Sequence, residues 1–202
     1  MAMIEIPQIT QEYLSPQMVR SSEVDDDFGP GGGTFQRALA AWNIRDTNTA
    51  KTLYEQAIAQ GLTPPVEGAA RSNLGQIMLR QHNLPAAIAH FLKVLRLEQV
   101  TYDSVSDAAE RLGIILTEVG RVEEGRALQA LAAQAQARLG YSLSPDAKET
   151  LRQLVRHTRD AEGERLTVDG AASRPSNAAL QSSASGVTLQ STRKKWWQFW
   201  GA

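Results

Sequence analysis

The sequence predicts an all-α fold, and three observations support this class. Residues 34–160 are rich in alanine, leucine, glutamine, arginine and glutamate, which favour helices, and their apolar positions recur at helical spacing. Glycine, proline and asparagine divide this span into segments of helical length, and no strand-like alternation competes. With 202 residues, of which 42% are hydrophobic, the chain suits one domain with tails better than two full cores.

Two tails and a terminal motif flank this predicted domain. Residues 1–33 contain prolines, an acidic cluster and a glycine-rich run, so we expect a disordered N-terminal segment that buries too little apolar surface to fold. Residues 161–192 are rich in serine and are expected to form a flexible linker. Residues 193–202 then form a basic and aromatic C-terminal motif whose composition differs from the rest of the chain.

The helix boundaries follow from residues that stop or start helices. The expected breaks between six helical segments include Gly61 with Pro64 and Pro65, Asn83, Gly120 and Gly140. Ser144 before Pro145 has the form of an N-cap followed by proline in the first turn, so a seventh helix is expected from Pro145 to Arg159. Leu151, Leu154 and Val155 share one face of that helix, which suits a cap at the end of the domain.

A repeated pattern organises the six helical segments. Leu74-Gly75 is followed by Ala87 and Phe91, and Leu112-Gly113 recurs 38 residues later. A glycine lets two antiparallel helices approach closely, while the larger residue of the partner helix fills the space beside it. A weaker copy begins near residue 34. Its second helix keeps the small and aromatic positions as Ala50, Tyr54 and Ala57, whereas Arg37-Ala38 replaces the Leu-Gly pair.

This order of residues resembles the tetratricopeptide repeat, whose period is about 34 residues. The resemblance covers residues 34–140 and implies three degenerate repeats, stacked as antiparallel helix hairpins in a solenoid with a capping helix. The alternative is an unrelated bundle of antiparallel helices in which the Leu-Gly pair arose by chance. The resemblance also implies protein binding on the concave surface formed by the first helix of each repeat.

The resemblance places Ser72, Glu110, Thr117 and eight further residues on that concave surface. The expected partner-binding residues are Phe35, Leu39, Trp42, Asn43, Gln76, Leu79, Arg80 and Ile114. Trp42 is the only tryptophan outside the terminal motif, and it either contributes to binding or fills the core of a degenerate first repeat. Arg80 and Asn43 either bind a peptide carboxylate or backbone, or belong to an ordinary solvated surface.

Enzymatic, metal-binding and nucleic-acid-binding functions find no support in the sequence. There is no cysteine, and the three histidines have no other ligand-type residue at metal-site spacing, so they are expected at the surface and no cofactor is predicted. No nucleophile and base can be paired. The run of glycines at 29–33 lacks the lysine of a phosphate loop, and a net charge of −1 gives no general attraction to nucleic acid.

The terminal motif is expected to bind a target of its own. It consists of Arg193, Lys194, Lys195, Trp196, Trp197, Phe199 and Trp200, together with Gln198, Gly201 and Ala202. Exposed aromatic residues at this density are rare unless a partner receives them. The motif would either anchor the chain at an anionic membrane surface or dock into a groove of another protein or a neighbouring copy, and an inert tail is the third alternative.

Together these features predict a protein-interaction adaptor or scaffold in a larger assembly, and no enzyme. The alternative is a peripheral membrane scaffold anchored by the terminal motif. Because the sequence contains neither a membrane-spanning apolar run nor a secretory signal, a cytoplasmic location is expected, with membrane association as the variant. The expected partners are one or more proteins, and homo-oligomerisation is left open.

Overall fold

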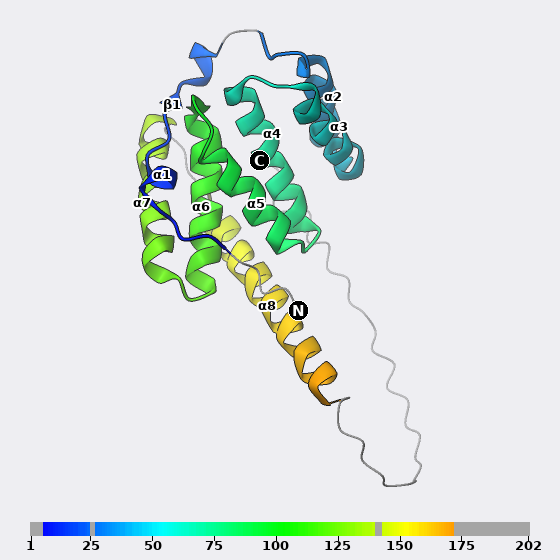
Figure 1. The fold of residues 1–202 in the computed structure, drawn as a ribbon, viewed down its shortest axis with the longest axis vertical. Helices are drawn as coiled ribbons and strands as arrows, with labels where there is room; N and C mark the ends of the chain where they lie inside the picture. Colours follow the sequence, from blue (N-terminus) through cyan, green and yellow to red (C-terminus); the bar gives the residue numbers. More distant parts are fainter. Residues whose placement is uncertain (1–5, 25–26, 140–142, 172–202) are drawn as a thin grey trace. The chain divides into compact units, whose positions relative to one another are not determined.

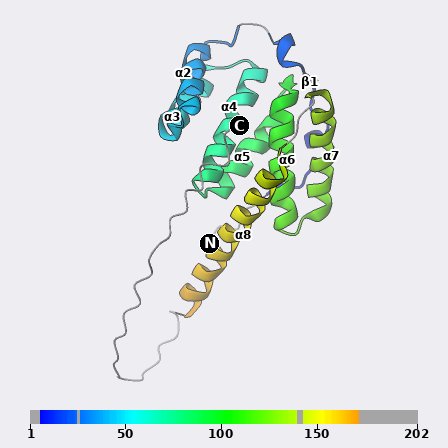
Figure 2. The same cartoon turned by 180° about the vertical axis from the view of Figure 1, so that it is seen from behind.

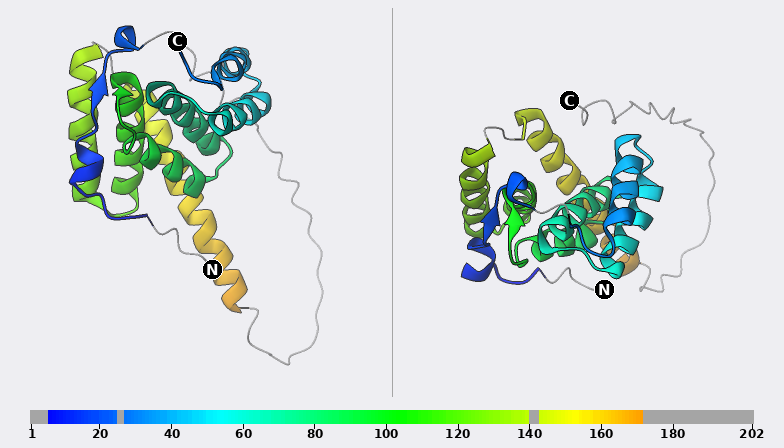
Figure 3. Two further views of the ribbon diagram at one scale, coloured as in Figure 1. Left: turned by 45° about the horizontal axis from the view of Figure 1, so that its top comes forward. Right: turned by 90° about the horizontal axis from the view of Figure 1, so that it is seen from above.

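The computed structural model describes residues 6–24, 27–139 and 143–171 of the chain (Figure 1). Three antiparallel helix hairpins form its main part. They are α2 (Gly32–Asn43) with α3 (Thr47–Gln60), α4 (Pro64–Arg80) with α5 (Leu84–Val94), and α6 (Tyr102–Glu118) with α7 (Val122–Leu139). The hairpins stand side by side in chain order, as Figure 2 shows from behind and Figure 3 from above. This arrangement confirms the predicted all-α fold of stacked hairpins.

Each hairpin turns through the same backbone conformation. The residue with a left-handed φ at the three turns is Arg45 (63°), His82 (57°) and Gly120 (91°). In the first two turns the next residue caps the second helix: Asp46 accepts a hydrogen bond from the Thr49 amide at 3.1 Å, and Asn83 accepts one from the Ala86 amide at 3.2 Å. The structural repeat therefore extends to turns whose sequences differ.

Small residues allow the two helices of a hairpin to approach closely. A Cβ atom on Gly75 would collide with the Phe91 ring of α5, and one on Gly113 would lie 2.9 Å from the carbonyl oxygen of Gly125 on α7. In the first hairpin Ala38 stands at the corresponding place and is fully buried. The predicted Leu-Gly positions are thus the places of closest helix contact.

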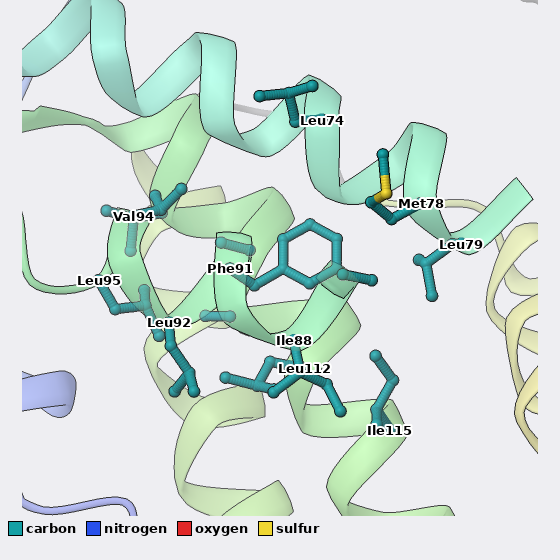
Figure 4. Close-up of a cluster of buried hydrophobic side chains, with 14 of the residues drawn as sticks. Leu74, Met78, Leu79, Ile88, Phe91, Leu92, Val94, Leu95, Leu112 and Ile115 are labelled. Carbon is teal, nitrogen blue, oxygen red and sulfur yellow. The ribbon is translucent and has the colours of Figure 1, made fainter. Parts of the chain in front are cut away.

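The core combines these small residues with a few large side chains. Tyr54 and Phe91, which occupy matching positions in α3 and α5, are both fully buried. In Figure 4 the Phe91 ring lies at the centre of an apolar cluster, with Leu74 and Met78 of α4 on one side of it. Asn73 donates a hydrogen bond of 2.9 Å to the Tyr54 hydroxyl, which ties α4 to the preceding hairpin.

An ordered N-terminal arm, residues 6–24, packs onto the hairpins and differs from the disordered segment expected over residues 1–33. It contains a short helix, a strand and a 3-10 helix, namely α1 (Gln11–Leu14), β1 (Met18–Val19) and η1 (Ser21–Glu23). Strand β1 pairs in parallel with β2 (Val100–Thr101), which lies in the connection between α5 and α6. Residues 1–5 and 25–26 lie outside the described residues.

The physical reason for this order is local. The mean composition of the first 33 residues conceals two apolar anchors, Ile9 and Tyr13, and both side chains are buried against the domain. The β1–β2 pair also gives part of the arm hydrogen-bond partners for its main chain. The burial of these two side chains and the short strand offset the entropy lost on ordering the arm. The composition alone had suggested that this entropy loss would keep the segment disordered.

Helix α8 (Pro145–Ala171) begins as predicted. The Ser144 hydroxyl oxygen accepts a hydrogen bond of 3.2 Å from the Ala147 amide, which confirms the N-cap. Leu151 and Val155 are buried, so the beginning of α8 covers the end of the hairpin stack.

Two ion pairs fasten this part of α8 to α6. Lys148 approaches Glu110 at 2.6 Å, and Arg156 approaches Glu118 at 2.7 Å. The two pairs are about two helical turns apart on each helix, so they hold α8 along α6 rather than at a single point.

The chain divides into two compact units, Met1–Thr158 and Arg159–Ala202. In the second unit helical backbone continues to Ala171, past the end expected at Arg159 and into the linker predicted over residues 161–192. Glu162, Glu164 and Arg165 are good helix formers, so the sequence favours this continuation although it offers little apolar surface. The rest of that linker and the motif at 193–202 lie outside the described residues.

Candidate functional site

The first helices of the three hairpins line a groove. Two adjoining hollows of about 330 and 260 Å³ form it, and Ala69, Asp103 and Ser104 line both. Helix α4 provides one side and the beginning of α6 provides the other. Residues before α2 and Phe35 of α2 complete the first hollow, and Leu143 closes part of the second.

The first hollow is mainly apolar. Val24 and Phe28, which precede α2, line it together with Pro65 and Val66 at the beginning of α4. The rings of Phe28 and Phe35 meet edge to face, with centroids 6.1 Å apart. Because each ring is fixed by the other, the hollow presents a preformed apolar surface.

The second hollow is polar and is organised around Asp107 on α6. The Asp107 carboxylate accepts hydrogen bonds from the Ser72 hydroxyl at 2.6 Å and from the Gln76 amide at 3.1 Å, both on α4. It also forms an ion pair of 2.7 Å with Arg111, one turn further along α6. These contacts join two neighbouring hairpins and fix polar side chains along the groove.

Beyond the two hollows lies an aromatic and basic cluster, named the basic end. Arg80 lies one helical turn beyond Gln76, and its guanidinium carbon is 4.6 Å from the ring centroid of half-buried Trp42 on α2. Partial burial lowers the pKa of Arg80, and the positive charges of Arg111 and Arg45 lower it further. Arginine stays protonated at physiological pH, so Arg80 and Arg45 bring positive charge to this end, while Asp107 balances the charge of Arg111.

Comparison with known families identifies the hairpins. The sequence model of the tetratricopeptide repeat family matches residues 35–104. Residues 35–104 are therefore tetratricopeptide repeats. Searches of curated proteins and of solved structures found no match. Repeats of this family generally mediate interactions between proteins.

The tetratricopeptide repeat match spans the first two hairpins and reaches the beginning of α6. The third hairpin repeats their architecture: Leu112 and Gly113 stand where Leu74 and Gly75 stand in α4, and Gly120 supplies the left-handed turn. The extra residues between the second and third hairpins, which lengthen the period to 38 residues, include strand β2.

The structure distributes the eight predicted binding residues over core and surface. Leu79 and Ile114 differ from the prediction, because both are buried. Leu79 belongs to the apolar cluster of Figure 4. Ile114 is buried because neighbouring helices enclose α6, so that even its positions between the repeat contacts are covered. Phe35 is almost fully buried and forms part of the floor of the first hollow.

The other five predicted residues have accessible side chains. Gln76 lines the second hollow, and Trp42 lies against Arg80 at the basic end. Leu39 is half-buried and Asn43 is exposed on α2, and neither lines the two hollows. The predicted positions therefore include both buried and accessible side chains of α2, α4 and α6.

Sequence reasoning missed the acidic residues of the groove. Asp103 accepts a hydrogen bond of 2.7 Å from the Ser21 hydroxyl of the arm, and Asp107 is the polar centre described above. A local pattern was available, because Asp103, Asp107 and Arg111 recur every four residues on one face of a helix. The contribution of Val24 and Phe28 had no comparable signal, since it depends on how the residues before α2 pack against α4 and α6.

Other sequence features have structural explanations. Gly31 packs directly against the Ala57 carbonyl, and its amide donates a hydrogen bond of 2.8 Å to the Gly61 carbonyl, so the glycine run joins the two ends of the first hairpin. His90 is half-buried, unlike the surface position expected for all three histidines. Within the part of the chain that the structure describes, no three side chains form a metal-ligand group. None of the described helices is long and apolar enough to cross a membrane.

Proposed function

We propose that this chain is an adaptor that binds an extended segment of a partner protein in the groove between α2, α4 and α6. The apolar hollow would receive an apolar side chain, and the polar centre at Asp107 would lie beside the main chain of the segment. The arginines at the Trp42 end would attract an acidic side chain or a terminal carboxylate. The expected location of such an adaptor is the cytoplasm.

The observation that carries this proposal is the polar floor shared by two repeats. Ser72 and Gln76 on α4 and Asp107 on α6 are held in one hydrogen-bonded group that lines an open hollow. Such preorganised groups reduce the entropy lost on binding, because their rotamers are already fixed. Apolar surface on one side and positive charge on the other then give the segment a preferred direction.

A double variant tests the basic end of the groove. Peptides that bind the full-length wild-type chain are first selected from a displayed random library. These peptides should bind the Trp42→Ala/Arg80→Ala variant about tenfold or more weakly than wild type, because the variant lacks the aromatic surface and one of the positive charges. Isothermal titration measures the affinity, and circular dichroism verifies the fold.

Arg126→Ala is the matched control for this test. Arg126 is an exposed arginine on α7, and it forms an ion pair of 2.8 Å with Glu123, which is also exposed. Its loss should leave peptide affinity unchanged. A folded double variant that binds the peptides as tightly as wild type would move the binding site elsewhere, whereas an unfolded one would show that Trp42 serves the core.

We further propose that the motif at 193–202 attaches the adaptor to a second target. Its sequence supports this role: three positive charges precede four aromatic residues, Trp196, Trp197, Phe199 and Trp200. Such a motif suits either an aromatic-binding pocket of a protein or an anionic membrane surface. The second alternative would make the chain a peripheral membrane scaffold.

Replacing the four aromatic residues of the motif by alanine should abolish recruitment to this target without changing the melting temperature of the hairpin domain. Two assays at low and high salt distinguish the targets. Co-sedimentation with mixed phosphatidylserine and phosphatidylcholine vesicles measures binding to lipid, and a pull-down measures protein capture. Binding to lipid through Arg193, Lys194 and Lys195 should fade as salt screens the charges, whereas docking into a protein pocket should largely survive. A motif whose replacement alters neither vesicle binding nor protein capture would contradict the proposal.

A further inference from the structure

An arginine and a glutamate at the beginning of α7 hold the N-terminal arm by its main chain. The Arg121 guanidinium donates hydrogen bonds to the carbonyl oxygens of Ile6 at 2.7 Å and Pro7 at 2.8 Å. The Glu124 carboxylate accepts one from the Ile9 amide at 2.7 Å. Arg121 and Glu124 also pair with each other, so the two side chains form one rigid clasp for three consecutive backbone groups along the arm.

Side chains of the arm add a second set of contacts. Ile9 and Tyr13 are buried. Arg96, which follows α5, lies over the Tyr13 ring at 5.4 Å and forms an ion pair of 2.9 Å with Glu12. The arm is therefore attached to the ends of two different hairpins, and Figure 1 shows it crossing in front of α6 and α7.

The strand pair transmits this attachment to the groove. Met18 pairs with Val100 and Val19 with Thr101, and the Val100 amide donates a hydrogen bond of 2.9 Å to the Gln17 carbonyl. This register fixes the residues that follow β1. Ser21 and Val24 line the first hollow beside Thr101, and Ser21 donates its hydrogen bond to Asp103, which lines both hollows.

We propose that the N-terminal arm is a specificity-determining wall of the groove, and that the docking of the arm on α7 is coupled to the affinity of the groove for an apolar side chain. The apolar hollow consists partly of arm residues, so release of the arm would open the hollow on that side. Linkage then requires that a ligand in the hollow stabilise the docked arm by the same factor. The part of this inference that concerns a bound ligand rests on the proposed function, whereas the structural coupling between the arm and the groove does not.

Amide hydrogen exchange of the full-length chain, followed by NMR, tests the coupling without any ligand. Arg121→Ala removes the clasp, and Arg96→Ala removes an exposed contact whose loss leaves the hairpins intact. Both variants should raise the exchange rate of the Val100 amide about tenfold or more, and the amide signals of Ala69 and Ser104 should shift. The Phe91 amide, in the core of α5, should keep its protection. Arg126→Ala is the matched control and should change none of these signals.

The peptides selected above supply the second readout. Those that carry an apolar residue at the arm side of the groove should lose about tenfold in affinity for Arg121→Ala and keep their affinity for Arg126→Ala. Unchanged Val100 exchange in both arm variants, or unmoved Ala69 and Ser104 signals in variants with a released arm, would overturn the inference. Equal peptide affinity with a released arm would also overturn it while leaving the proposed function intact. If no peptide binds wild type, the proposed function fails and the exchange results alone decide the coupling.

Discussion

His90 is a half-buried histidine surrounded by positive charge. Its Nδ1 atom is buried without a hydrogen-bond partner among the described residues. Burial, and then the charges of Arg71 on α4, Lys93 on α5 and Lys51 on α3, lower the pKa of His90 from 6.5 to about 4. The native state therefore holds this imidazole in its neutral form at pH values where an unfolded chain would protonate it.

The free energy of unfolding should consequently depend on pH. The contribution of His90 is fully present above pH 6.5 and is lost as the pH falls from 6.5 towards 4, because the unfolded state takes up a proton that the native state resists. Urea denaturation at several pH values measures this slope, and His90→Gln should flatten it. His157→Gln, at an exposed position of α8, is the control and should keep the wild-type slope. A slope that persists in His90→Gln would contradict the assignment.

At the scale of single residues, the sequence predicted small and large core positions better than surface positions. Gly75, Phe91 and Tyr54 were identified from the repeat because helix contacts constrain size at those places. Leu79 was assigned to the surface and is buried, since its exposure depends on how a neighbouring hairpin packs. Asp107 acquires its role from Ser72 and Gln76, which lie on a different helix.

At the scale of elements, the contact between α4 and α5 depends on the absence of a side chain at one position. Gly75→Ala should destabilise the chain by about 1–3 kcal/mol, because the new Cβ meets the buried Phe91 ring and the core has little room to adjust. This cost should outweigh the gain of about 1 kcal/mol that alanine brings to a helix interior. Urea denaturation measures the difference.

Gly33→Ala provides the matched control in α2. A Cβ atom at Gly33 would meet nothing within 4 Å, so alanine should leave stability unchanged or raise it by up to about 1 kcal/mol. If both glycine variants unfold at the same urea concentration, the close approach of α4 and α5 does not require glycine, and the interpretation of the Leu-Gly pair is wrong.

Helix beginnings were predictable from sequence to the extent that their causes are local. The caps at Asn83 and Ser144 act within three residues, and both are present. The N-terminal arm was not predictable in the same way, because Ile9 and Tyr13 are buried only by helices that come much later in the chain. The continuation of α8 to Ala171 was missed because it follows from helix propensity without apolar periodicity.

At the scale of the whole molecule, the hairpins and the arm make separable contributions to stability. A fragment of residues 34–160 should keep the helical circular dichroism and cooperative melting of a folded domain, since it contains the apolar periodicity. It should melt about 5 °C or more below a fragment of residues 6–160, because burying Ile9 and Tyr13 contributes about 1.5–3 kcal/mol each before ordering costs. Equal melting temperatures would show that the arm adds no stability, and loss of cooperative melting would contradict the boundary at residue 34.

The arm has a further consequence for the order in which the protein folds during synthesis. Its contacts with Arg121 and Glu124 join residues 115 positions apart in the chain. A ribosome therefore releases the arm long before it makes the helix that receives it. Each hairpin closes through local contacts and can fold as it emerges, whereas the arm has to wait for α7. The segment that is translated early is thus among the last to reach its native place, and until then Ile9 and Tyr13 are open to chaperones and to neighbouring nascent chains.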